Sequence, residues 1–557
     1  MNIIKKTAVL LLAAFLTLFS ACRATPGENS SALPLAPTKT DAVNGGENTI
    51  TLLYSASDTL DPYSAATELN RQLCRLLFEP LVKLDNEFHL SYSLAKKIEI
   101  KGKTCTVTLA NKKFSDGSAL TAADVVYSFQ LAKASSTEYG YKLYEAVSAK
   151  ESGSDKVVFT MAKADPYFAN LLDFPILKKG SEKRATSDGV TRPPIGCGRY
   201  AANENLNGLV LNTESVGNGC AIQEIRLIDA PDAESISHYV EVSAADLYYS
   251  DIADGRILRM SGQKVDINLN HLVMIGVNHE VDALAETALR QALSTGIDRS
   301  AICRESYYNN ALAANGFYNP VWEEVAAIQN IEIAANQEIT IANLEKIGYN
   351  SLDSDGVRKN GSGSKLRFTL LVNSENSMRV AAAKQIAAQL WAYGIKIEVK
   401  QMKYKAFADA LEKGSFQLYL AEVAITPNMD LSELVLPGGS AAFGVKKEKT
   451  EQNSEKSKKA ASSEESDSSQ NAESSEGTAA AEPEETVTES AAGLITGLYN
   501  GSNTIGDIAA ALQNEMPFIP VCYRTGVLFY HDDIENVENS SASDIFFSIE
   551  SYTIQNH

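Results

Sequence analysis

A strand–helix–strand pattern between residues 366 and 399 constrains the fold of this chain more than any other feature. Residues 366–372 place apolar side chains at alternate positions, which is typical of a strand. Residues 378–391 follow with the spacing of an amphipathic helix that closes near Gly394, and residues 395–399 alternate again. Because two strands joined by one helix usually pair in parallel, the pattern predicts an α/β fold.

The length of the chain sets how many packed units to expect. Its 557 residues exceed one ordinary domain, so we expect two or three units. Hydrophobic residues make up 44% of the chain, which is enough for sizeable cores. The formal net charge of -20 disfavours binding to nucleic acid or to an anionic membrane surface.

The first residues predict export and a lipid anchor. Lys5 and Lys6 precede an apolar run over residues 7–19, as in a signal peptide. Residues 18–21, Leu-Phe-Ser-Ala, directly precede Cys22, and together they resemble a bacterial lipobox. We therefore expect residues 1–21 to be removed and the Cys22 thiol to be lipidated, with an ordinary secretory signal and an incidental cysteine as the alternative. The predicted location is the outer face of the bacterial cytoplasmic membrane, with lipid as the only membrane attachment.

Two stretches have compositions that disfavour a packed structure. Residues 22–46 are rich in Pro, Ala, Thr, Ser and Asn and predict a flexible tether. Residues 446–489 consist largely of Ser, Ala, Glu and Lys and contain no aromatic residue. Such a segment buries too little apolar surface to offset the entropy of ordering, so we expect a disordered insertion.

Sequence motifs for catalysis, phosphate binding or zinc binding do not occur in this chain. There is no GxSxG, no HExxH and no glycine-rich phosphate loop, and the six histidines are scattered. Asp353, Asp355 and Gly356 resemble the start of a calcium loop, but Ser364 stands at the twelfth position, where glutamate is needed. We therefore expect no enzymatic activity, no cofactor and no metal site.

The cysteines leave two alternatives open. Apart from Cys22, six cysteines are spaced irregularly and form no CxxC pair. Cys197 and Cys220 are the nearest-spaced candidates for a disulfide, which an exported protein permits. The alternative is that most of the six are buried free thiols.

Residues 113–129 combine a strand end, a tight turn and the start of a capped helix. Phe114 closes an alternating run, and Gly117 permits the turn. Thr121 fits an N-cap position, with Asp124 three residues later and an apolar stripe behind it. This block closely resembles the signature of the family 5 extracellular solute-binding proteins, which serve peptide-type ABC importers.

Further blocks resemble the same family in the same order along the chain. Residues 57–63 contain Leu-Asp-Pro, and residues 78–82, 194–200 and 289–299 match later motifs. In the block 194–200, Arg199 occupies a position where the family commonly has proline. Several independent matches in the right order identify the chain as a member of this family.

The resemblance implies a two-lobed, venus-flytrap fold of the type II periplasmic-binding-protein class, with an extra subdomain in lobe 1. Lobe 1 would comprise residues 47–75, 190–275 and 515–557. The accessory subdomain would span residues 76–189, and lobe 2 residues 276–514 with the insertion 446–489. A solute would be enclosed between the lobes by hinge closure and passed to a membrane permease driven by cytoplasmic ATPases. We expect the protein to act as a monomer.

The resemblance also implies a peptide as the solute, with its ammonium group met by an aspartate. In the family this aspartate lies in a segment that holds a tryptophan and an Asp-Pro pair, and residues 419–430 here contain neither. Glu422 and Asp430 are therefore alternative anionic partners. The candidate ligand-binding residues come from three parts of the chain and are Tyr54, Ser55, Ser57, Asp58, Glu422, Thr426, Asn428, Asp430 and Tyr523.

Other functions remain open at this level. The first alternative keeps the fold but changes the ligand to a sugar, an opine or another small cationic solute. In the second, a surface sensor or scaffold presents peptide without importing it. An extracellular hydrolase is the third, and the absence of a nucleophile motif from the sequence disfavours it.

Overall fold

The computed structural model describes residues 48–185, 191–217, 219–326, 328, 333–445, 490–498 and 501–555. The predicted signal peptide (1–21), Cys22, the tether (22–46) and the insertion (446–489) lie outside these residues. Within the described ranges, no helix combines the length and the apolar character that a membrane crossing needs.

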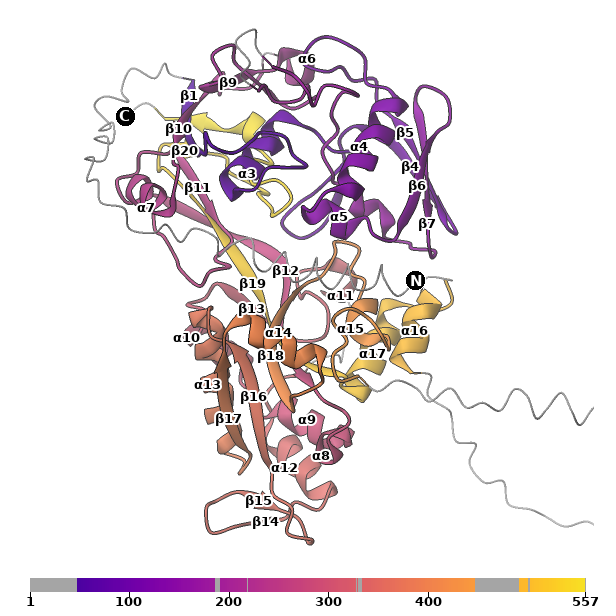
Figure 1. Cartoon of the computed structure of the whole chain (residues 1–557), viewed down its shortest axis with the longest axis vertical. Coiled ribbons are helices and arrows are strands. Elements are labelled where there is room, and N and C mark those ends of the chain that lie inside the picture. Colours follow the sequence, from indigo (N-terminus) through magenta and orange to yellow (C-terminus); the bar gives the residue numbers. More distant parts are fainter. Residues whose placement is uncertain are drawn as a thin grey trace, which may run out of the picture.

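Two packed bodies, lobe 1 and lobe 2, are joined by a pair of long antiparallel strands (Figure 1). These strands are β12 (Gln263–Val277) and β19 (Phe518–Tyr530). Each of them enters two hydrophobic cores. In β12, Ile267 packs in the core of lobe 1 and Leu272 in the core of lobe 2. The pairing register of the two strands shifts between Asn268 and His271, where β12 passes from one core to the other.

Lobe 1 is built on a four-stranded sheet whose members are far apart in the sequence. β1 (Thr49–Tyr54) pairs in parallel with β10 (Glu224–Asp229), and β9 (Gly208–Leu211) and β8 (Tyr200–Ala202) follow in antiparallel order. Phe546 and Tyr552, near the C-terminus, pack in the same core. Further elements of this part are α3 (Glu68–Leu77), α6 (Thr213–Val216), α7 (Ala233–Glu241), β11 (Leu247–Ser250), β20 (Ile534–Glu535), η2 (Ile549–Ser551) and β21 (Thr553–Ile554).

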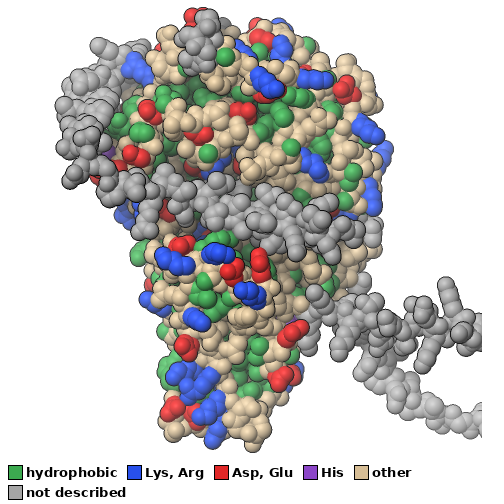
Figure 2. Space-filling model, in the orientation of Figure 1, with side chains coloured by type: hydrophobic (Ala, Val, Ile, Leu, Met, Phe, Trp, Pro, Cys, Tyr) green, Lys and Arg blue, Asp and Glu red, His purple; other side chains and the backbone are tan. Residues whose placement is uncertain are grey.

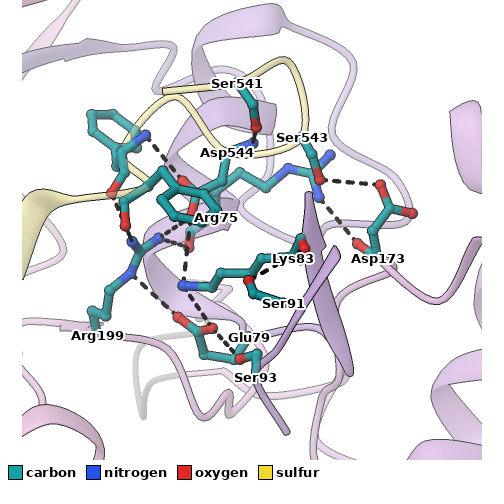
Figure 3. Close-up of polar contacts among 12 residues, drawn as sticks. Arg75, Glu79, Lys83, Ser91, Ser93, Asp173, Arg199, Ser541, Ser543 and Asp544 are labelled. Carbon is teal, nitrogen blue, oxygen red and sulfur yellow. Dashed lines mark hydrogen bonds and ion pairs between the residues drawn. The ribbon is translucent and has the colours of Figure 1, made fainter. Parts of the chain in front are cut away.

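A buried ion-pair network fastens the C-terminal segment to lobe 1 (Figure 3). Arg199 donates from Nη2 to Asp544 Oδ2 at 2.7 Å and from Nη1 to the carbonyl of Phe546 at 2.7 Å. Its Nε lies 3.3 Å from Glu79 Oε1, and Lys83 pairs with the other oxygen of Glu79 at 3.0 Å. Arg199 therefore joins three segments that are distant in sequence.

The accessory subdomain holds the signature block. Its antiparallel sheet has the order β4 (Ala95–Lys101), β5 (Thr104–Leu109), β7 (Lys156–Met161), β6 (Ala146–Glu151), and α4 (Ala122–Ala134) packs on it. The helix start predicted at Thr121 is confirmed, because its N–H and hydroxyl donate to Asp124 Oδ2 at 2.9 and 2.6 Å. Smaller elements of the subdomain are β2 (Val82–Leu84), β3 (Leu90–Tyr92), α5 (Glu138–Lys142) and η1 (Phe168–Leu171).

Lobe 2 contains the predicted parallel unit. β16 (Arg367–Asn373), α13 (Ser377–Trp391) and β17 (Lys396–Met402) follow one another, and the two strands pair in parallel. They extend a sheet of the order β11-β19-β12-β18-β16-β17, in which β18 spans Leu418–Ala424 and β13 (Ala311–Ala313) pairs with β19. The α/β prediction from the local pattern is therefore confirmed.

Short helices and hairpin strands complete lobe 2 in the described chain. They are α8 (Asp282–Ala285), α9 (Thr287–Thr295), α10 (Arg299–Glu305), α11 (Glu323–Ala326), α12 (Gln337–Lys346), β14 (Ser351–Leu352), β15 (Arg358–Lys359), α14 (Tyr404–Glu412), α15 (Ser432–Val435), α16 (Ala491–Leu498) and α17 (Ile505–Glu515). All six cysteines of the described residues are free and buried, so Cys197 and Cys220 form no disulfide here. The numerical boundaries between lobes stay predictions, because β12 and β19 belong to both cores.

Candidate functional site

A cavity of 590 Å³ lies between the two lobes. Its volume falls in the range of about 300–1,000 Å³ that is usual for small-molecule sites. α3 and the C-terminal loop line it from lobe 1, α5 from the accessory subdomain, and α13 and β18 from lobe 2. On the face drawn in Figure 2, acidic and basic side chains are interspersed over both lobes.

Glu422 in β18 is the centre of a buried charge cluster on that wall. Its Oε1 accepts hydrogen bonds from Arg524 Nε at 2.9 Å and Nη2 at 2.8 Å, and its Oε2 accepts one from Arg379 Nη2 at 3.0 Å. His271 Nδ1 lies 3.0 Å from Glu422 Oε1. His271 in β12 is the register partner of Arg524 in β19 and of Ala424 in β18, which explains why these distant side chains converge.

The cluster keeps its charges despite burial. Burial raises the pKa of the Glu422 carboxyl, but Arg524, His271 and Arg379 together hold that pKa well below its usual range. Burial lowers the pKa of the Arg524 guanidinium. The negative charges of Glu422 and, to a smaller extent, Asp251 outweigh the effect of burial, so that pKa lies above its ordinary value. One carboxylate is therefore shared between two guanidinium groups.

Beside the cluster, β18 offers an open strand edge. β12 pairs with β18 from Leu418 to Ala424, whereas β16 pairs with it only from Leu418 to Leu420. Val423 and Ala424 line the cavity, and no strand of the described chain covers their other edge. Tyr141 reaches across from the accessory subdomain and donates its hydroxyl to the carbonyl of Ala424 at 3.4 Å. An extended ligand can use such an edge by backbone hydrogen bonding.

The segment after β18 docks against the accessory subdomain and closes one side of the cavity. Lys163 pairs with Asp430 at 2.7 Å, and Tyr144 donates its hydroxyl to Glu433 at 2.6 Å. Asn428 donates to Asp165 Oδ2 at 2.7 Å. Burial raises the pKa of the Asp165 carboxyl to about 6, against the opposing effect of the hydrogen bonds from Asn428 and from the N–H of Tyr167. The two lobes are therefore held together by polar contacts at this rim.

The predicted ligand residues separate into three groups in the structure. Glu422 and Thr426 line the cavity. Asn428 and Asp430 belong to the interlobe contact described above. The other five, which lie elsewhere, are Tyr54, Ser55, Ser57, Asp58 and Tyr523.

Three residues of the last group, Asp58, Ser55 and Tyr523, have structural partners. Asp58 accepts hydrogen bonds from the N–H and the hydroxyl of Thr67, at the start of α3. Ser55 donates its N–H to Asn70, and the hydroxyl of Tyr523 donates to the carbonyl of Phe317 at 2.8 Å. Ligand contact by these residues stays a prediction.

Sequence reasoning missed Arg379, although a signal was present. α13 buries Arg379 in the same stripe as Ala382, Ala383 and Ile386, at helical spacings of three, four and seven residues. An arginine inside an apolar stripe needs a buried partner, which here is Glu422. Asp251, in the loop after β11, also lines the cavity, but no sequence pattern around it marks it as a cavity residue.

Comparison with known proteins agrees with this architecture. The chain matches the model of the bacterial extracellular solute-binding proteins, family 5 middle, over residues 89–441. It is 25% identical over 468 residues to the oligopeptide-binding protein AppA of Bacillus subtilis, covering 79% of this chain and 82% of AppA.

Two solved structures share the fold. The structure of Bacillus subtilis AppA in complex with a nonapeptide has a TM-score of 0.55 at 17% identity, covering 92% of this chain and 100% of that one. NikZ from Campylobacter jejuni in complex with Ni(L-His) has a TM-score of 0.56 at 16% identity, covering 91% of this chain and 99% of that one.

Two lobes, two shared strands and a cavity between the lobes define a two-lobed solute-binding protein. The chain belongs to the bacterial extracellular solute-binding proteins of family 5. The family membership that the sequence motifs predicted is thereby confirmed.

Proposed function

We propose that this protein is the lipid-anchored, monomeric solute-binding component of an ABC importer and that it captures peptides between its lobes. The observation that carries the proposal is the open edge of β18 at residues 421–424 on the wall of a 590 Å³ cavity. A peptide in extended form supplies the alternating N–H and C=O groups that a strand edge pairs with. The oligopeptide-binding name of the Bacillus subtilis relative supports the same ligand class.

Two observations support delivery to a permease: the membership of the chain in a family of extracellular solute-binding proteins, and the paired strands β12 and β19, which can act as a hinge between the lobes. The rim contacts between residues 424–433 and the accessory subdomain are polar, and Tyr167 of the subdomain also packs edge-on against Trp322 of lobe 2. Opening of the lobes about a hinge would break these contacts. In the proposed cycle the open form takes up peptide and the closed form docks on the permease, which cytoplasmic ATPases drive.

Binding of short peptides to the purified protein, measured by thermal unfolding and calorimetry, tests the ligand class. A ligand at about 100 times its Kd stabilises the folded state by about 2.7 kcal/mol, which shifts the unfolding temperature by several degrees. Matched peptides methylated at alternate backbone nitrogens serve as controls, because methylation removes the N–H that pairs with the edge. Absence of any shift across peptide pools of different length overturns the peptide proposal.

The lipid anchor is tested separately in cells. Replacing Cys22 by Ser leaves no thiol for lipidation, so we expect the protein to move from the membrane fraction to the soluble extracytoplasmic fraction. A matched Cys197→Ser variant, altered at a buried thiol, should remain with the membrane. Unchanged fractionation of the Cys22 variant contradicts the proposed anchor.

A metal chelate is a second candidate ligand. His271 lies on the cavity wall with 30% of its side chain exposed, and imidazole is a common ligand of nickel. The NikZ neighbour was solved with Ni(L-His). Titration with nickel and L-histidine together, compared with nickel alone and with peptide, separates the two candidates.

A further inference from the structure

Two buried thiols from different elements meet in the core of lobe 2. Cys303 lies on α10 and Cys522 on β19, and α10 packs against β19. Both side chains belong to the same hydrophobic core, with exposures of 6% and 0%. The thiols are within hydrogen-bonding reach of each other, with Cys522 as the donor and Cys303 as the acceptor. Two residues far apart in the sequence are therefore placed as a dithiol pair.

A buried arginine lies beside this pair. Arg299, at the start of α10, is 5% exposed, and its hydrogen bonds go to neutral oxygens, among them the carbonyls of Pro520 at 2.8 Å and Ile333 at 2.6 Å. The groups whose negative charge acts on its guanidinium are the two thiols, Cys522 first and Cys303 second. A buried guanidinium without a carboxylate partner favours another anion beside it, and a thiolate is such an anion.

The two thiols differ in how easily they ionise. The hydrogen bond from Cys522, aided by the charge of Arg299, holds the pKa of the Cys303 thiol below its ordinary value against the effect of burial. Burial raises the pKa of the Cys522 thiol well above its ordinary value, and its hydrogen bond to Cys303 raises it further. Because the thiolate is the reactive form, Cys303 is the nucleophile of the pair and Cys522 the thiol that reacts second.

The turn after α10 gives Cys303 a route to solvent. Asn309 in this turn donates its N–H to the carbonyl of Cys303 at 2.9 Å. Tyr308 and Asn309 have φ of +53° and +62°, in the left-handed region that costs residues other than glycine energy. The side chain of Tyr308 is 63% exposed, so the turn lies at the surface. A small oxidant reaches Cys303 when this turn opens.

We infer that Cys303 and Cys522 form a redox-modification site, which hydrogen peroxide oxidises to a disulfide that thiol reductants reverse. The family is extracellular, so the pair lies outside the reducing cytoplasm, where disulfides persist. The disulfide fastens α10 to β19 two residues before Arg524, which supports the cavity wall through Glu422. Oxidation therefore stiffens one support of that wall.

The reaction has two steps. The Cys303 thiolate attacks one oxygen of hydrogen peroxide, so that an S–O bond forms, the O–O bond breaks and hydroxide leaves to become water. The Cys522 sulfur, having lost its proton, then attacks the sulfenic sulfur of Cys303, so that the S–S bond forms, the S–O bond breaks and a second hydroxide leaves. Each thiol gives up one proton and one electron, and one peroxide is reduced to two waters.

Non-reducing peptide mapping of the purified protein after peroxide treatment tests the site. With about a tenfold molar excess of hydrogen peroxide, we expect a cross-link between the segments that contain Cys303 and Cys522. The protein should lose the mass of two hydrogen atoms, and dithiothreitol should restore both thiols. Complete retention of reduced thiols, or a cross-link confined to another pair such as Cys197 and Cys220, overturns the inference.

Single substitutions assign the two roles. Cys303→Ser should give no cross-link and leave Cys522 reduced. Cys522→Ser should also give no cross-link, but Cys303 should then hold a sulfenic acid, which dimedone captures. Cys105→Ser, at a buried thiol of the accessory subdomain, is the matched control and should give the wild-type yield of cross-link.

Two further outcomes contradict parts of the inference. Capture of Cys522 by dimedone in Cys303→Ser overturns the assignment of Cys303 as the nucleophile. Oxidation of Cys303 in the wild type without a cross-link overturns the disulfide. If a variant does not fold, the map of the wild-type protein still decides whether the site exists. Peptide binding stands or falls separately, because none of these measurements contains a peptide ligand.

Discussion

Glu422 Oε1 accepts hydrogen bonds from two nitrogens of Arg524, Nε at 2.9 Å and Nη2 at 2.8 Å. This contact connects the cavity strand β18 to β19, one of the two strands that run through both lobes. The other oxygen of Glu422 reaches Arg379 in α13. The cluster therefore supports the cavity wall from three elements at once.

Removing the Glu422 carboxylate should destabilise the protein strongly. In Glu422→Ala two buried guanidinium groups lose their shared partner, and loss of one member of a buried ion pair costs about 3–5 kcal/mol. Urea unfolding measures the change. The control is Glu68→Ala, at a partly exposed pair with Arg71, which should cost no more than about 1 kcal/mol. Equal losses in the two variants would contradict the central role of Glu422.

Removing the Lys163–Asp430 ion pair should weaken closure of the lobes. These residues are joined at 2.7 Å across the rim, with side-chain exposures of 27% and 10%. Lys163→Ala should cost about 1 kcal/mol of closure, or about fivefold in ligand affinity. Calorimetry and small-angle scattering report affinity and opening. Lys97→Ala, at an exposed pair within the accessory subdomain, should change neither.

Asp165 should make stability rise as the pH falls. Its pKa is raised by burial to about 6, above its value in the unfolded chain, so the folded state binds the proton more tightly. The stabilisation is fully present below the unfolded pKa and is lost as the pH rises through about 6.

The measurement compares the wild type with Asp165→Asn. The free energy of unfolding of the wild type, minus that of the variant, should increase by on the order of 2 kcal/mol between about pH 7.5 and about pH 4. Taking the difference removes the titration of other groups. A difference that is independent of pH would rule out a raised pKa at Asp165.

Replacing Arg199 should loosen the C-terminal segment from lobe 1. Arg199 is 1% exposed and bonds to Asp544, to the carbonyl of Phe546 and to Glu79 (Figure 3). Arg199→Met should cost about 3–5 kcal/mol, because Lys83 alone then faces two buried carboxylates.

Hydrogen exchange should show the loss locally. We expect amide protection to fall first in residues 541–552, since their anchor is gone. Arg192→Met, whose guanidinium donates to an exposed backbone carbonyl, is the matched control and should leave that protection unchanged. Uniform loss of protection across lobe 1 would argue against a local anchor.

Much of the fold follows from the sequence because its causes are local. The alternation over residues 366–372, the helix over 378–391 and the second strand reappear as β16, α13 and β17 within two or three residues. The start of α4 at Thr121 was predictable because a cap needs only residues three positions apart. The two-lobed arrangement was predictable only through the order of the family's motifs.

The candidate site was predictable in part. Glu422 and Thr426 were identified from the segment that departs from the family pattern, and both line the cavity. The segment's missing tryptophan and Asp-Pro pair suggested a changed ligand partner, but not which residue replaces it. Asn428 and Asp430, from the same segment, turned out to face the accessory subdomain.

The sequence by itself determined the elements and the family, since periodicity, caps and motif order are properties of neighbouring residues. Only the tertiary structure decided which charges meet. Glu422 and Arg524 are 102 residues apart in the chain and pair because β12 lies between their strands in one sheet. No local pattern contains that proximity, and so the ligand preference of the cavity is a property of the assembled lobes.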